Sequence, residues 1–61
     1  MRLLRAVERH MRETGITATS FGRGAVNDPR LVRDLRNGRE AGKRVTARVL
    51  SFITAREEEA V

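Results

Sequence analysis

Sixty-one residues suffice for a single domain, and thirteen Lys or Arg residues against eight Asp or Glu residues give the chain a formal net charge of +5. The absence of cysteine excludes disulfides, thiolate zinc sites and cysteine nucleophiles. No apolar run approaches the roughly 18 residues of a membrane span, and no continuous apolar stretch follows Arg2 and Arg5. We therefore expect neither a membrane anchor nor a secretory signal.

The positive charge comes almost entirely from arginine, because Lys43 is the one lysine. Three of the eight acidic residues lie together at 57–59, so the rest of the chain is more basic than the total suggests. A small basic domain attracts polyanions at long range. Arginine favours partners that accept two hydrogen bonds at once, such as phosphates and guanine edges. A genome rich in G and C is a competing reason for arginine over lysine.

The first predicted helix spans residues 2–14, with Leu3, Leu4, Val7 and Met11 at helical spacing, and Gly15 ends it. His10, the single histidine, lies next to this stripe. Because the chain offers neither cysteine nor a second histidine, we interpret His10 as a surface or boundary residue rather than a catalytic or metal-binding group.

A second helix is predicted to start after a cap at Thr17 or Thr19 and to run to about Val26. Gly22 and Gly24 are poor helix formers, so their presence indicates close backbone approach, and we expect Gly22 to face a crossing helix. A phosphate-binding loop is the rival interpretation, but the Lys-Ser/Thr ending and a preceding strand are missing. The inward residues are predicted to be Phe21, Ala25 and Val26.

A sharp corner at Val26-Asn27-Asp28 precedes the third predicted helix. Asn27 tolerates the left-handed conformation that such an exit needs. Asp28 is a favoured N-cap, and Pro29 is well suited to the first helical position, where its missing N–H costs nothing. We expect this helix to begin at Pro29 and to end at Gly38.

The third helix has two faces when its residues are placed at about 100° intervals. Leu31, Val32 and Leu35 share one arc. The opposite side carries hydrogen-bonding groups from Arg30, Arg33, Asp34 and Asn37, with Arg36 on the flank. This layout suits a helix in the DNA major groove, where Arg reads guanine and Asn reads adenine. A solvated helix face is the open alternative.

A basic, glycine-containing segment, 39–43, leads to a last predicted helix, Lys43–Arg56. We expect the apolar stripe of this helix to close the core and to leave Leu50 or Phe52 free for a partner. Residues 57–61 form a predicted frayed, acidic tail, so the domain spans residues 1–56. Since no strand pattern occurs, the sequence predicts an all-α fold, a compact bundle of four short helices with a helix-turn-helix. The stripe consists of Val45, Val49, Leu50, Phe52 and Ile53.

This arrangement resembles the Cro/phage-repressor-like helix-turn-helix family, and within it a type of small, arginine-rich protein of alphaproteobacteria and their prophages. The resemblance covers roughly residues 15–55. It implies that Asp28, Pro29, Arg30 and Arg33 face base edges, and that Thr17, Thr19 and Arg39 touch the DNA backbone. The residues that carry it are Phe21-Gly22 and Ala25 in the second helix, Leu31-Val32 and Leu35 in the third, Gly38-Arg39, and the stripe from Val45 to Ile53.

The leading hypothesis is a small transcriptional regulator that binds double-stranded DNA in the cytoplasm, associated with the nucleoid. A domain this small makes few contacts, so we expect a homodimer or a larger protein partner. The hypothesis assigns base contacts to Arg30, Arg33, Asn37 and Asp34, and phosphate contacts to Thr17, Thr19, Arg36, Arg39, Lys43 and Arg44.

The alternative is a protein-interaction adaptor that docks an acidic partner, such as an RNA polymerase subunit, through its basic face and last helix. RNA binding ranks lower, because stacking on exposed aromatics is the usual mode for single strands and only two Phe are present. We expect no enzymatic activity, metal, cofactor or small-molecule ligand, since so short a chain has little room for a pocket with positioned catalytic groups.

Overall fold

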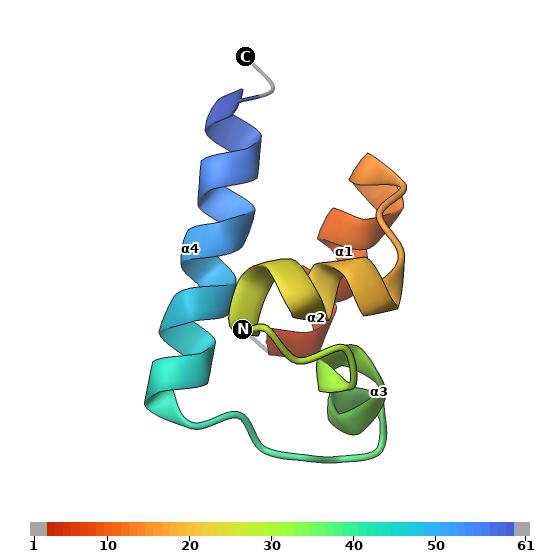
Figure 1. Ribbon diagram of the computed structural model, residues 1–61. Helices are drawn as coiled ribbons and strands as arrows, with labels where there is room; N and C mark the ends of the chain where they lie inside the picture. Colours follow the sequence, from red (N-terminus) through yellow and green to blue (C-terminus); the bar gives the residue numbers. More distant parts are fainter. Residues whose placement is uncertain (1–2, 60–61) are drawn as a thin grey trace.

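Four α-helices follow one another in the computed structural model, which describes residues 3–59 (Figure 1). They are α1 (Leu3–Thr14), α2 (Ala18–Val26), α3 (Leu31–Arg36) and α4 (Lys43–Glu59). The described range contains no strand, so the predicted all-α fold of four helices is confirmed. None of these helices combines the length and the hydropathy that crossing a membrane requires. Residue 2, the predicted start of the first helix, and residues 60–61 of the predicted tail lie outside the described residues.

The N-cap and the exit of α2 are formed by local hydrogen bonds. The Thr17 hydroxyl accepts a hydrogen bond from the Ser20 N–H at 3.2 Å, so Thr17 is the cap and Thr19 is not. At the other end Asn27 adopts the predicted left-handed conformation, with φ 57° and ψ 34°. The N–H groups of Asn27 and Asp28 donate to the carbonyls of Arg23 and Gly22. These bonds turn the chain sharply away from α2.

The predicted start of α3 at Pro29 is wrong by two residues, because the helix begins at Leu31. Pro29 and Arg30 form a tight turn instead. The Asp28 carboxylate accepts from the Arg30 N–H at 2.9 Å, and the Asp28 carbonyl accepts from the Leu31 N–H at 3.2 Å. This three-residue spacing is tighter than that of an α-helix. Asp28 therefore caps the turn that leads into α3.

Glycine lets the corner and α4 approach α2 closely. A Cβ at Gly22 would collide with the Asp28 carbonyl oxygen and lie 3.3 Å from the Leu31 Cβ. A Cβ at Gly24 would lie 2.8 Å from the Phe52 ring of α4. The predicted close approach at Gly22 is confirmed, with the corner and the start of α3 as its neighbours.

The core forms where α1 and α2 both pack against α3 and α4. Each fully buried Val, Leu, Ile or Phe side chain contributes about 1.5–3 kcal/mol of transfer free energy to folding. The predicted inward faces of α2 and α3 are confirmed, although Val26 is only half-buried. The buried apolar residues are Val7, Phe21, Ala25, Leu31, Val32, Leu35, Val49 and Ile53.

His10 belongs to this core, and the prediction of a surface or boundary residue is wrong. Its side chain is 3% exposed, and its ring meets those of Phe21 and Phe52 edge-on, at centroid distances of 5.6 and 6.2 Å. His10 follows Val7 by three residues and so shares its buried face. Its Nε2 atom is buried and finds no hydrogen-bond partner among residues 3–59. Phe52 likewise packs against the core instead of remaining free.

Helix α4 continues to Glu59, three residues beyond the predicted end at Arg56. The segment 57–59 is helical, so the prediction of a frayed tail is wrong for these residues. Glutamate is a good helix former, and no Gly or Pro interrupts this stretch. The last turns of α4 extend beyond the other three helices (Figure 1).

Candidate nucleic-acid interface

Helix α3 presents a polar face because its apolar face is anchored. Leu31 and Val32 are 1% and 0% exposed, and Leu35 is buried beside them. Arg30, Arg33 and Asn37, three of the predicted base contacts, are exposed. Within residues 3–59 neither Arg30 nor Arg33 forms an ion pair. Two guanidiniums, Arg33 on α3 and Arg30 in the turn that leads into it, are therefore available to a partner.

Asp34, the fourth predicted base contact, forms an ion pair with Arg39. The Nη1 atom of Arg39 lies 3.1 Å from Oδ2 of Asp34 and 3.6 Å from Oδ2 of Asp28. The Arg39 N–H also donates to the Asp34 carbonyl at 2.9 Å. Gly38, with φ 94°, makes this return possible. The predicted phosphate contact Arg39 is thus folded back against the end of α3.

Arg36, another predicted phosphate contact, pairs with a residue of α1. Its Nε atom donates to Oε1 of Glu8 at 2.7 Å, and the two side chains are 50% and 40% exposed. The pair joins α3 to α1 and partly neutralises one cation of the α3 face. The Arg36 side chain remains half exposed, so the pair does not withdraw it from the surface.

The remaining predicted phosphate contacts lie at the starts of α2 and α4. Lys43 and Arg44 are exposed and, in the described part of the chain, form no ion pair. The segment between α3 and α4 runs along one end of the molecule, so α3 and the first turn of α4 share that end (Figure 1). Thr17 and Thr19 are exposed, but the Thr17 hydroxyl already accepts the capping hydrogen bond.

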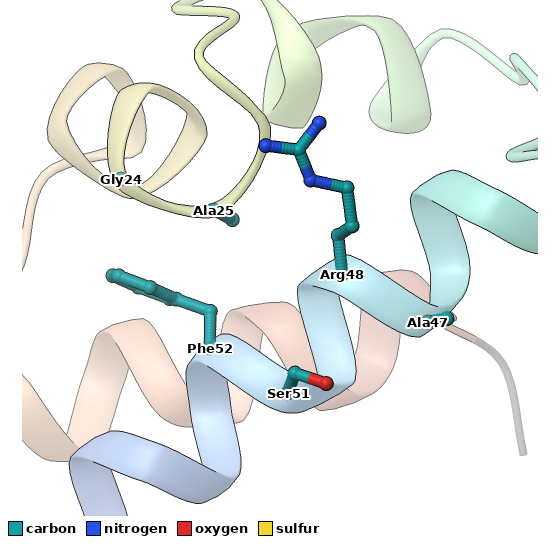
Figure 2. Close-up of a pocket in the computed structure, with 6 residues that line it drawn as sticks. All are labelled: Gly24, Ala25, Ala47, Arg48, Ser51 and Phe52. Carbon is teal, nitrogen blue, oxygen red and sulfur yellow. The ribbon is translucent and has the colours of Figure 1, made fainter.

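Two shallow apolar hollows flank α4. One lies between α2 and α4, where Gly24 and Ala25 face Phe52 (Figure 2). Figure 2 shows Arg48 extending from α4 on the side of α2, whereas Ser51 points away from α2. The other hollow lies between α1 and α4 and includes the half-buried Leu50. No group of three His, Asp or Glu residues suitable for a metal ion occurs between residues 3 and 59.

Comparisons with models of protein families, with curated proteins and with solved structures found no match. The helix-turn-helix resemblance therefore stays a prediction.

Sequence reasoning missed the ion pairs that occupy Arg36 and Arg39. The return of Arg39 had a local signal, because Gly38 follows the helix directly and a glycine there lets the chain turn back. The pairing of Arg36 with Glu8 had none, since the two residues are 28 positions apart.

Proposed function

We propose that the protein binds double-stranded DNA as a small transcriptional regulator and presents α3 to the major groove. The observation that carries the proposal is the pair Arg30 and Arg33. Both are exposed and, among the described residues, form no ion pair. Arg33 lies on α3 and Arg30 in the turn directly before it, and Leu31 and Val32 hold the start of α3 in the core. Guanidiniums on a rigid element suit bidentate contacts with guanine O6 and N7.

The cations in and around α3 differ in how freely they can contact DNA, because some of them already form ion pairs. Four exposed cations can contact phosphates or bases without breaking any ion pair of the described structure, namely Arg30, Arg33, Lys43 and Arg44. Arg36 and Arg39 can contact phosphates only through the guanidinium N–H groups that their carboxylate partners leave free, or after those ion pairs break. Glu8, Asp28 and Asp34 thereby lower the net attraction of this surface for a polyanion.

The test is a titration of the full chain with a fluorescently labelled duplex, followed by anisotropy at several salt concentrations. If about six phosphates are engaged, log K falls against log salt with a slope near roughly −5. A slope near zero would rule out the proposal. Selection from a random duplex library at near-physiological salt then separates specific binding from purely electrostatic binding.

A second candidate function is a protein-interaction adaptor, which the half-buried Leu50 in the α1–α4 hollow favours. In this proposal an acidic partner, such as an RNA polymerase subunit, contacts the exposed Arg30 and Arg33 and buries Leu50. Recovery of one stoichiometric protein partner that survives nuclease treatment supports it. Loss of every partner after nuclease treatment supports DNA binding instead.

A further inference from the structure

One exposed face of α4 has a distinct charge pattern. Seven exposed residues lie within about 60° of Ser51 when α4 is viewed down its axis at about 100° per residue. The centre of the face is small and uncharged, with cations toward its N-terminal end and an anion toward its C-terminal end. In chain order the residues are Arg44, Ala47, Arg48, Ser51, Thr54, Ala55 and Glu58.

These end charges have the sign that an isolated helix disfavours. Helix N-termini prefer anions and C-termini prefer cations, because the aligned peptide dipoles leave a partial positive and a partial negative charge at these ends. Arg44 occupies the first turn of α4, whereas Glu57 and Glu58 occupy its end. In the described structure none of the three forms an ion pair. An antiparallel helix with the same charges would place its glutamates beside Arg44 and its arginine beside the glutamates at the C-terminal end of α4, so both unfavourable end charges would be neutralised.

We propose that α4 pairs with α4 of a second copy of this chain, antiparallel and centred on Ser51. Arg44 and Glu58 are equally distant from Ser51 along the helix. A two-fold axis at Ser51 therefore places Arg44 of each copy against Glu58 of the other. It also sets Ala47 against Ala55 and Ser51 against its own counterpart, where small side chains let the helices approach.

A second copy fits this face better than a nucleic acid does. A two-fold interface must be self-complementary. The charges on this face meet that condition, because Arg44 and Glu58 lie on opposite sides of Ser51. A polyanion would be attracted by Arg44 and Arg48 but repelled by Glu57 and Glu58. One helix face buries less area than a standard protein interface. We accordingly expect a weak dimer that dissociates as salt is raised, because exposed ion pairs are screened.

The first experiment is sedimentation equilibrium of the full chain without nucleic acid, over a wide concentration range at low ionic strength. Arg44→Glu and Glu58→Arg each bring like charges together twice, so each weakens the dimer roughly tenfold or more. The double variant restores the affinity to within roughly threefold of the original. Arg12→Glu and Glu40→Arg make the same charge changes at exposed positions off this face and leave the dimer intact.

The second experiment uses the absence of native cysteine. Ser51→Cys, next to the two-fold axis, forms a disulfide-linked dimer under mild oxidation, whereas the exposed control Ser20→Cys on α2 does so far more slowly. Circular dichroism verifies that each variant is helical. The proposal is overturned if the original chain stays monomeric throughout, if the double charge variant is as weak as the single ones, or if both cysteine variants crosslink equally. Since no DNA is present, these outcomes leave the DNA-binding proposal untouched.

Discussion

Glu8 of α1 and Arg36 of α3 form the shortest ion pair among the described residues, with 2.7 Å between Oε1 and Nε. The pair reaches across 28 residues of sequence and connects a helix outside the proposed interface to a cation within it. Its energetic worth is small, because both side chains are about half exposed. Its effect on the charge of the α3 face is direct.

Glu8→Gln is expected to strengthen DNA binding roughly two- to fivefold at low salt, because it removes a negative charge beside Arg36. Stability should change by less than about 1 kcal/mol. Duplex titration by anisotropy measures the affinity. Glu13→Gln is the matched control, since Glu13 pairs with Arg9 on α1, at 3.5 Å and largely in solvent. An equal gain in both variants would assign the effect to net charge alone.

Asp34→Asn tests whether Asp34 reads a base or positions Arg39. The structure shows its carboxylate 3.1 Å from Arg39 Nη1, so the substitution should release that cation and raise DNA affinity. The preferred DNA sequence should stay the same. Library selection with both proteins makes the comparison. A changed preference at one base pair would instead make Asp34 a base contact.

Arg33→Ala is expected to cost about 1–3 kcal/mol of binding free energy for the preferred duplex and to relax the preference at one base pair. Arg33 is exposed and free of ion pairs in the described structure. Titration against a panel of single-base variants measures both effects. Arg5→Ala removes the same charge from α1 beside the α1–α4 hollow and serves as the control. A uniform loss over the panel would make Arg33 a phosphate contact.

Gly22→Ala is expected to destabilise the protein by about 1–3 kcal/mol or more, because the new methyl group collides with the backbone carbonyl of Asp28. For a domain of this size each kcal/mol lowers Tm by about 4–8 °C. Gly42→Ala is the matched control, since a Cβ there meets nothing within 4 Å. Thermal unfolding followed by circular dichroism gives the comparison. Equal stability of the two variants would contradict the packing of the corner on α2.

His10→Leu is expected to stabilise the fold by about 1 kcal/mol, because it removes a buried nitrogen without a hydrogen-bond partner. His10→Ala should instead cost about 2–4 kcal/mol, since it opens a cavity between Phe21 and Phe52. Chemical denaturation measures both free energies of unfolding. A clear loss of stability in His10→Leu would contradict this expectation.

Much of the fold could be read from local signals. The apolar spacing in α1 and α3, the Thr17 cap and the left-handed Asn27 each depend on residues within one or two turns. The two faces of α3 follow from its six residues alone. The predicted start of α3 at Pro29 is wrong because Asp28 and Pro29 suit a tight turn and a helix N-terminus equally well.

The amino-acid sequence alone therefore determined the four helices, the corner and the exposure of Arg30 and Arg33, because helical periodicity and capping act between near neighbours. Only the tertiary structure decided that Arg36 is paired with Glu8 and that His10 is buried. Those outcomes depend on how α1 and α2 pack against α3 and α4. Packing brings Glu8 to Arg36 and the ring of Phe52 to that of His10, across distances in sequence that no local pattern spans.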